Sequence, residues 1–486
     1  MSFSTEGVLS TTGAQASRLH EAIEPTLRAH PGVSGIYALE NGRDAFAARA
    51  LLAAAAERSI DVECYIWRAD VTGYLMFEAL WSAAERGVRV RLLLDDNNTA
   101  GLDETLVALD AHENIEVRLF NPLRYRRLRW INYLLDFRRV NRRMHNKSFT
   151  VDHEVSVLGG RNVGDEYFDA GSAMNFADLD VLAVGPIATE VSSNFDLYFN
   201  SESAHPARRL LGKASIQAMH NLKAAFAAVH AKPGSRQYLE ALDEKGFVTQ
   251  LEEGQLAMEW VGARLVSDDP AKVLHAEPPK ELLMLPRLLQ LTGQARVQFD
   301  LVSPYFVPAI TGTKDLVQLA KQGVRVRVLT NSLASTDVAA VHAGYAKRRK
   351  ALLRAGLEIY EVKRVEPTST SLTRGSSAAS LHAKTFEIDG RYVYVGSFNF
   401  DPRSAYLNTE MGLLLDSPQL ARRLNHFFAT QVPAHSYRVR LDEHDDLEWV
   451  ETTPAGEKTY RIEPHTNAFQ RMMLALVATL PIDWLL

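Results

Sequence analysis

The sequence predicts an α/β fold built from two homologous halves. Residues 84–93 read Ala-Glu-Arg-Gly-Val-Arg-Val-Arg-Leu-Leu, and residues 320–329 repeat this run as Ala-Lys-Gln-Gly-Val-Arg-Val-Arg-Val-Leu, 236 positions later. A His-x-Lys pattern with a following aspartate starts at His145 and again at His382, 237 positions later. Landmarks that return in one order at nearly one offset indicate a duplication. A chain of 486 residues also exceeds one ordinary core, which favours two domains.

Strand-like and helix-like segments alternate within each half. In the first half, β-branched and aliphatic runs predict strands, and the alanine- and leucine-rich stretch 74–85 predicts a helix. The expected strands span residues 60–67, 88–94, 115–120, 147–151 and 155–158. This alternation implies helices layered on a mixed sheet. The expected units are a first half at 1–200, a helix-rich connection at 201–290, a second half at 291–440 and a C-terminal extension at 441–486.

Composition limits the class of protein. Hydrophobic residues make up 46% of the chain and charged residues 23%, as in globular proteins. The single cysteine, Cys64, excludes an intrachain disulfide framework and a cysteine-based zinc site, and it fits a reducing compartment. The first thirty residues lack a basic start followed by an apolar run, and no run reaches the roughly 18–20 apolar residues that span a bilayer. We therefore expect a cytoplasmic location.

The His-x-Lys motifs carry residues for acid–base and nucleophilic chemistry. His145 and Lys147 are two positions apart, as are His382 and Lys384, and on a strand this spacing places both side chains on one face. A base or nucleophile then lies beside a fixed positive charge. A lone pair of this kind would usually be incidental, but two copies predict a catalytic site.

Carboxylates near the motifs fall into two groups. Asp152 and Asp389 come seven positions after the histidines, at turns and with the opposite strand parity, so we expect them to be structural. Asp180 and Glu410 precede apolar strands further along the chain. A carboxylate on a neighbouring strand can hold the tautomer and orientation of a catalytic histidine, and we expect Asp180 and Glu410 to do so.

A glycine-containing turn with an asparagine follows each motif. Gly160 precedes Asn162 in the first half, and Ser397 precedes Asn399 in the second, with each asparagine seventeen residues after its histidine. Small residues let a backbone approach an oxyanion, while amide and hydroxyl groups donate to it. These four residues predict a phosphate-binding cradle.

The paired motifs resemble the HKD motifs of the phospholipase D superfamily, and the similarity extends from about residue 60 to about residue 416. The resemblance implies two α/β halves packed around a pseudo-twofold axis, with both motifs in one cleft. It also implies that one histidine attacks phosphorus to form a phosphohistidine while the other protonates the leaving alcohol, without metal or cofactor. In the superfamily the first-half histidine is often the nucleophile, which suggests His145 as nucleophile and His382 as general acid; the reverse assignment stays open.

Residues 65–73, 141–148 and 330–345 more closely resemble the C-type bacterial cardiolipin synthases. That family joins two phospholipids and releases a small head-group alcohol, so phospholipids and a membrane surface are the partners implied. Many other cardiolipin synthases begin with two spanning helices, which this chain lacks. Alternatives are a hydrolase that uses water, a nuclease and a non-catalytic lipid-binding protein; with a net charge of −5, no nucleic acid is expected. The donor and acceptor lipids, the oligomeric state and an accessory protein are left open.

Two segments are candidates for contact with the inner face of the cell membrane. In the first, residues 130–137, an apolar run is flanked by arginines, which suits shallow insertion among head groups. Its candidate contact residues are Arg126, Arg127, Trp130, Leu134, Phe137, Arg138 and Arg139. The alternative is a buried helix that caps the cleft. The second segment is a C-terminal apolar stripe that includes Met473, Leu476 and Trp484, and a helix packed on the domain would look the same.

Overall fold

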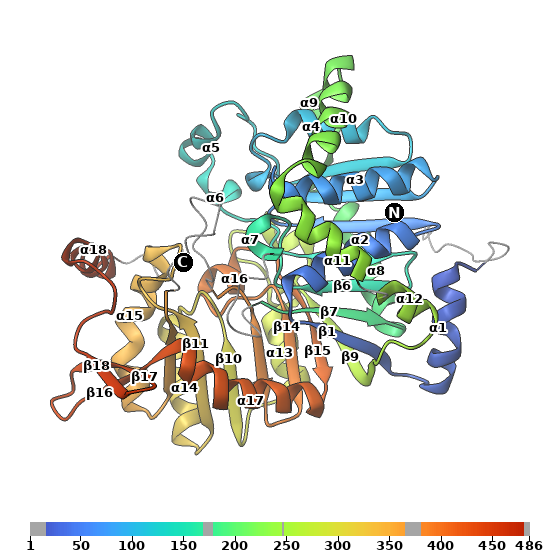
Figure 1. The fold of residues 1–486 in the computed structure, drawn as a ribbon. Helices are drawn as coiled ribbons and strands as arrows, with labels where there is room; N and C mark the ends of the chain where they lie inside the picture. The colour runs from blue at the N-terminus through green and yellow to red at the C-terminus, as the bar shows by residue number, and fades with distance from the viewer. Residues whose placement is uncertain (1–15, 169–177, 245–246, 365–380, 481–486) are drawn as a thin grey trace.

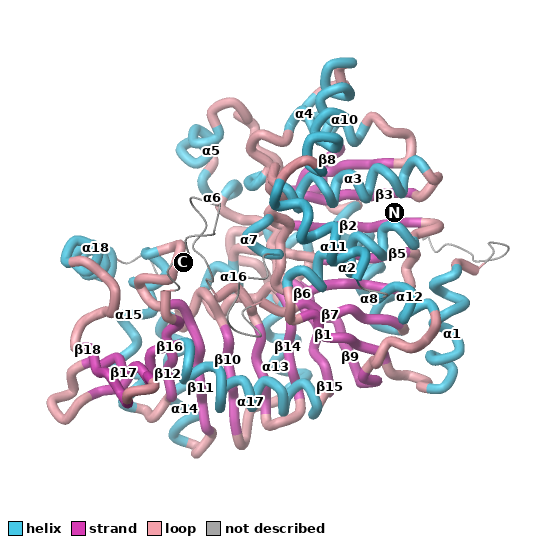
Figure 2. The backbone as a smooth tube through the Cα atoms, in the orientation of Figure 1, coloured by secondary structure: helices cyan, strands magenta, loops and turns pink. Residues whose placement is uncertain are grey.

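Two mixed β-sheets, one from each half of the chain, lie side by side at the centre of the molecule, and helices surround them (Figure 1). The computed structural model describes residues 16–168, 178–244, 247–364 and 381–480. In Figure 2 the strands of both halves run toward a common central region of loops. The α/β class predicted from the sequence is confirmed.

The first sheet has nine strands in the part of the chain that the structure describes. In spatial order they are β8 (Ala204–Pro206), β4 (Ile115–Phe120), β3 (Arg89–Asp95), β2 (Ser59–Cys64), β5 (Ser148–Val151), β6 (Val155–Gly159), β7 (Asp180–Val184), β1 (Ser34–Leu39) and β9 (Glu259–Ser267). The pairs β4–β3 and β3–β2 are parallel and the others are antiparallel. The sequence pattern found the strands beside the first motif but not β1.

The second sheet repeats this order. Its strands are β18 (Gly456–Tyr460), β17 (Leu447–Thr453), β16 (Ser436–Leu441), β12 (Glu358–Val362), β11 (Arg325–Asn331), β10 (Gln298–Val302), β13 (Thr385–Ile388), β14 (Tyr392–Gly396) and β15 (Met411–Asp416). The order β12-β11-β10-β13-β14-β15 matches β4-β3-β2-β5-β6-β7, with the same parallel and antiparallel pairs. The two halves are therefore structural duplicates.

Helices cover both sheets. Those of the first half and the connection are α1 (Arg18–Ala29), α2 (Gly42–Ala55), α3 (Val71–Glu85), α4 (Asp103–Asp110), α5 (Arg129–Leu135), α6 (Phe137–Val140), α7 (Asp165–Phe168), α8 (Pro186–Phe199), α9 (Ala207–Leu211), α10 (Ile216–His230), α11 (Arg236–Glu244) and α12 (Phe247–Glu252). Those of the second half are α13 (Met284–Thr292), α14 (Ala309–Lys321), α15 (Ala339–Arg354), α16 (Pro402–Tyr406), α17 (Pro418–His435) and α18 (Ala468–Ala478). Among the described residues, none of these helices has the length and apolarity to cross a bilayer.

The repeated run of the sequence encodes the turn from a helix into a strand. Helix α3 ends just before Gly87 and α14 ends just before Gly323, and these glycines have φ values of 93° and 88°. A residue with a Cβ is strained at such angles, so glycine ends each helix and directs the chain into β3 or β11. The same run places a buried arginine in each sheet: Arg91 bonds Asp61 at 2.7 Å, and Arg327 bonds Asp300 at 2.7 Å.

The halves share a hydrophobic core. One cluster of buried side chains combines β6, β7 and α8 of the first half with β14, β15 and α17 of the second. Strand β9 pairs with β1 through its first residues and with β15 through the rest, so it joins the two sheets. The connection expected to be helix-rich thus also supplies the strand between the halves, because an amphipathic strand of this length is hard to recognise among helices.

The aspartate that ends each motif holds a turn. Asp152, in the left-handed region at φ 53°, accepts hydrogen bonds from the backbone N–H groups of residues 57, 58 and 59 at 2.7–3.1 Å. Asp389, at φ 57°, accepts from the N–H groups of residues 296, 297 and 298 at 2.8–3.1 Å. Each carboxylate therefore ties the end of the motif strand to the start of its neighbour, β2 or β10.

We expect Asp152→Ala to lower the free energy of unfolding by about 2–4 kcal/mol, because it leaves one buried and two partly buried N–H groups without acceptors. Asp389→Ala should cost less, since its bonds to residues 296 and 297 are exposed to water. Urea unfolding followed by circular dichroism measures both. Equal stability of the two variants and the wild type would contradict this role.

Candidate active site

The two motifs meet where the first half touches the segment before β15. The His145 N–H donates to the Thr409 carbonyl at 2.8 Å, and the Thr409 N–H donates to the Arg143 carbonyl at 2.9 Å. Met144 and Thr409 form a parallel bridge between the halves. The backbone beside the first histidine is therefore paired with the second half.

The ring of His145 is held by the second half. Its Nδ1 lies 2.8 Å from Oε2 of Glu410 and 3.0 Å from the carbonyl oxygen of Ser397. A carbonyl oxygen can only accept, so Nδ1 carries the hydrogen and the neutral ring keeps its lone pair on Nε2. Burial and the charges of Lys147 and Lys384 hold the pKa of His145 well below its usual range. The result is a neutral imidazole with a defined tautomer.

His382 is held by a carboxylate of the first half, Asp178, whose Oδ2 lies 2.8 Å from its Nδ1. The expectation that Asp180 would do this is wrong. Asp180 is fully buried and bonds Arg49 at 2.8 Å, and Arg161 lies 3.6 Å away, so its charge is already neutralised within the first sheet. Glu410, the carboxylate expected from the second half, does contact a motif histidine, His145 of the first half.

Strand register explains why the sequence pattern identified the carboxylate that bonds His145 but not the one that bonds His382. Asp180 in β7 and Gly412 in β15 occupy the same position opposite the glycine that ends β6 or β14. Asp178 and Glu410 each lie two residues earlier, outside the strands. Once the register is known, counting two residues back from this position identifies Asp178 as the equivalent of Glu410. The sequence alone does not, because the number of residues between the motif histidine and the carboxylate differs between the halves.

The electrostatics of the two pairs differ. Burial raises the pKa of Asp178, but the neighbouring charges of His382 and Arg161 outweigh it and leave that pKa below its usual range. Burial raises the pKa of Glu410 to about 7 despite Lys147 nearby. Burial and Lys384 lower the pKa of His382, and Asp178 opposes them. Because Asp178 stays ionised, His382 is the histidine better placed to hold a proton.

Both motif lysines are buried in the site. Each Nζ donates to the backbone carbonyl of its own histidine. Burial lowers the pKa of Lys147 to about 7 and that of Lys384 to about 8. An anion bound between them would restore their charged forms, because an opposite charge favours protonation.

The expected phosphate cradle is only partly what the structure shows. Asn162 leaves Nδ2, and Asn399 leaves Oδ1, buried without a hydrogen-bond partner among the described residues, whereas Oδ1 of Asn162 accepts from the N–H of residue 66 at 3.2 Å. Gly160 and Ser397 serve the histidine carboxylates instead. The Gly160 N–H donates to a backbone carbonyl, and a Cβ there would lie 2.4 Å from Oδ1 of Asp178. The Ser397 hydroxyl bonds Oε2 of Glu410 at 2.5 Å.

Sequence reasoning missed the residues behind Glu410. Asp268, just after β9, accepts from the Glu410 N–H at 2.8 Å and donates its own N–H to the Glu410 carbonyl at 2.9 Å. Lys272 neutralises Asp268 at 2.9 Å and is fully buried. Two tyrosines also line the histidines: Tyr65 is edge-on to His145 at 4.8 Å and Tyr167 to His382 at 5.0 Å between centroids. They carry no spacing signal that links them to the motifs.

The arginine-flanked segment is not the buried helix of the alternative expectation, and only some of its arginines are free of partners within the described chain. Its apolar side chains are exposed, with Trp130 61%, Leu134 73% and Phe137 38% accessible, so it is not a buried helix. Several of its arginines are instead structural: Arg126 bonds Asp96 and Asp103, and Arg139 bonds Asp136 and Asn121. Of the candidate arginines, Arg127 and Arg138 are exposed. The choice of Arg126 and Arg139 as membrane contacts is therefore corrected.

The C-terminal stripe forms helix α18. The helix packs on α15, and its outer side exposes Met473, Leu476 and other apolar residues. Trp484 lies outside the described residues. In Figure 1, α5 and α18 both project from the left side of the molecule.

A group with metal-ligand spacing occurs away from the motifs. Within the described ranges, His342, Glu361 and Glu463 are the group whose ligand atoms converge. Arg349 already donates to both carboxylates, at 2.7 and 2.6 Å, so their charge is neutralised. This cluster fixes the C-terminal extension to α15.

Comparison with known proteins identifies the family. The profile described as "Cardiolipin synthase, PLD-like domain" matches residues 50–199 and 288–432, and the chain belongs to this family. It is 45% identical to cardiolipin synthase C of Escherichia coli strain K12, over 96% of this chain and all of that protein. Cardiolipin synthase B of the same strain is 24% identical, over 78% of this chain and 76% of that protein. The crystal structure of phosphatidylserine synthase from Haemophilus influenzae shares the fold, with a TM-score of 0.59 and 12% identity over 97% of this chain and all of that one.

We expect Asp178→Asn to shift the alkaline limb of the pH–rate profile to lower pH. Asp178 raises the pKa of His382 in the folded protein, so its loss lets the proton that a general acid needs dissociate at lower pH. Turnover of a phosphodiester at pH 8 should fall by roughly 10–100-fold. Asp180→Asn, which does not touch His382, should leave the limb in place. A shifted limb in the Asp180 variant alone would contradict the assignment.

Proposed function

We propose that the protein is a cardiolipin synthase-like phosphatidyltransferase, which exchanges phosphodiester bonds between phospholipids and releases a small head-group alcohol. The observation that carries the proposal is one buried site in which two histidines, each oriented by a carboxylate of the other half, share two lysines. Family membership and the similarity to cardiolipin synthase C over nearly the whole chain support the lipid substrate.

In the first step, Nε2 of His145 attacks phosphorus, and the bond from phosphorus to the head-group oxygen breaks. His382 gives its proton to that oxygen, and the alcohol leaves. In the second step, neutral His382 takes the proton of an acceptor hydroxyl, whose oxygen attacks phosphorus and displaces His145. Lys147 and Lys384 offset the charge of the phosphoryl oxygens, which carries most of the stabilisation in such reactions. A covalent intermediate lets the donor alcohol depart before the acceptor arrives.

The roles of the histidines follow from their partners. A nucleophile must be neutral, and His145 has both a depressed pKa and its hydrogen on Nδ1. A general acid must hold a proton, and His382 faces the ionised Asp178. These contacts support the assignment of His145 as nucleophile over its reverse.

We expect His145→Ala and His382→Ala each to reduce turnover to below about one hundredth of the wild type, because neither role can be filled by the other residue. The assay uses vesicles of defined phospholipids that include phosphatidylglycerol, with mass spectrometry of the lipid products. Rapid denaturation of the wild type in detergent at mildly alkaline pH should leave a phosphatidyl adduct on His145, because the bond between nitrogen and phosphorus is broken by acid. Phosphatidic acid as the sole product would contradict a transferase, and an adduct on His382 would reverse the roles.

We further propose that α5, the turn before it and the start of α6 dock on an anionic membrane surface. Exposed apolar side chains gather there: Tyr125, Leu128, Trp130, Leu134, Leu135 and Phe137. Arg124, Arg127 and Arg138 are exposed beside them and form no ion pair with the described part of the chain. Apolar insertion ringed by free positive charge fits the head-group region. The exposed side of α18 offers a second apolar contact.

Changing Arg124, Arg127 and Arg138 together to glutamine should weaken binding to anionic vesicles roughly 100-fold, since each arginine contributes about 1 kcal/mol near such a surface. Vesicle sedimentation measures the effect. Turnover of a short-chain monomeric substrate should persist, because the histidines are untouched. The matched control changes the exposed Arg208, Arg209 and Arg422, on α9 and α17, in the same way. Equal losses in both variants would show that only net charge matters.

A further inference from the structure

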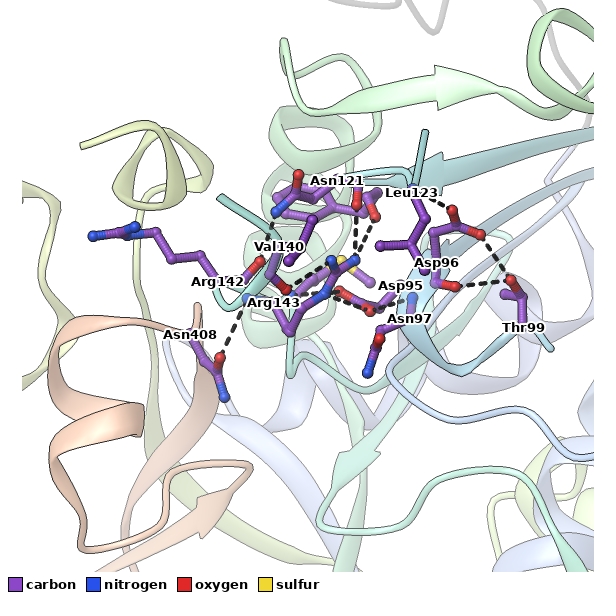
Figure 3. Close-up of polar contacts among 12 residues, drawn as sticks. Asp95, Asp96, Asn97, Thr99, Asn121, Leu123, Val140, Arg142, Arg143 and Asn408 are labelled. Atoms are coloured by element: carbon purple, nitrogen blue, oxygen red, sulfur yellow. Dashed lines mark hydrogen bonds and ion pairs between the residues drawn. The ribbon is translucent and has the colours of Figure 1, made fainter. Parts of the chain in front are cut away.

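A buried ion pair joins Arg143, two residues before His145 in the sequence, to Asp95 (Figure 3). Nε of Arg143 lies 2.9 and 3.0 Å from the two carboxylate oxygens of Asp95, the last residue of β3. The side chains are 2% and 0% exposed. Arg143 therefore points into the protein.

The guanidinium of Arg143 ties three elements together. Nη2 donates to the carbonyls of Phe120 and Asn121, at the end of β4, at 3.2 and 2.9 Å, and Nη1 donates to the carbonyl of Val140, at the end of α6, at 3.3 Å. The fixed planar fork of arginine suits such a set of acceptors. Asp95 also accepts from the N–H of residue 144 at 2.8 Å. The residues just before His145 are thereby anchored to the first sheet.

The same residues are anchored to the second half. Asn408 accepts from the Arg143 N–H at 3.2 Å, and Thr409 pairs with the backbones of Arg143 and His145. The next residue, Glu410, bonds the His145 ring. The position of His145 relative to Glu410 therefore depends on a segment held by Asp95 on one side and by residues 408–409 on the other.

The second half has a neutral counterpart. Asn331 ends β11 as Asp95 ends β3, and its Oδ1 accepts from the Leu381 N–H while its Nδ2 donates to the Leu381 carbonyl, both at 3.2 Å. Leu381 precedes His382 as Met144 precedes His145. An amide thus anchors the general acid, whereas a buried charge pair anchors His145.

We propose that Asp95 and Arg143 are positioning residues that fix His145 for attack on phosphorus. The proposal rests on the nucleophilic role proposed above. A nucleophile needs alignment to within a fraction of an ångström, and a displacement of about 1 Å can cost about 10²-fold in rate. The ion pair supplies rigidity at the one histidine whose Nε2 forms a bond to phosphorus.

The test separates attack from proton donation with a short-chain p-nitrophenyl phosphodiester. Its leaving group needs no general acid, so the burst of p-nitrophenol reports attack by His145 alone. Asp95→Asn should slow the burst by about 10–100-fold and Arg143→Lys by less, because lysine keeps the charge but not the fork. The matched control is Arg327→Lys, in a pair of equal burial with Asp300 that touches neither histidine, and it should keep the burst.

Each outcome has one meaning. The absence of both a burst and an adduct in the wild type would reject the proposed function. A wild-type burst with an unchanged rate in Asp95→Asn would overturn the positioning role alone. An equally slow burst in Arg327→Lys would mark the effect as general loosening of a sheet and would overturn it as well. If Asp95→Asn does not fold, Arg143→Lys carries the test, and its burst should be slower than those of the wild type and of Arg327→Lys.

Discussion

The site depends on the exchange of carboxylates between the two halves. Glu410 of the second half orients His145 of the first, and Asp178 of the first orients His382 of the second. Neither half can complete its own histidine, so the contact between the halves is a condition for the chemistry and not only for stability. The shared core and strand β9 hold that contact in place.

The exchange also breaks the symmetry of the duplication. A short, ionised Asp178 faces one histidine, while a longer Glu410, with a pKa raised by burial to about 7, faces the other. The proposed chemistry needs one neutral and one protonated histidine at the same time. A nearly symmetric scaffold can supply both, because the two histidines have different carboxylate partners. The residues that anchor the two motif strands differ in the same way: the charged pair of Asp95 and Arg143 lies before His145, and the neutral Asn331 bonds the residue before His382.

Buried positive charge in the site is only partly offset when no substrate is bound. Burial lowers the pKa of both lysines and of both histidines, so their protonated forms are disfavoured in the empty site. A bound anionic phosphodiester would stabilise the protonated forms. Two asparagine amide atoms, Nδ2 of Asn162 and Oδ1 of Asn399, also have no hydrogen-bond partner in the described part of the chain.

The sequence by itself determined the duplication, the α/β class, the two motifs and the turn role of their aspartates, because helix ends, strand parity and turns are local properties of the chain. It also singled out Glu410. Only the tertiary structure decided that Asp178 and not Asp180 serves His382, since the choice depends on strand register and on which arginines neutralise a carboxylate. The arginines of the basic segment divide in the same way. Arg126 and Arg143 are structural because acidic partners distant in the sequence lie beside them, whereas Arg127 is exposed. No local sequence pattern distinguishes the structural arginines from the exposed one.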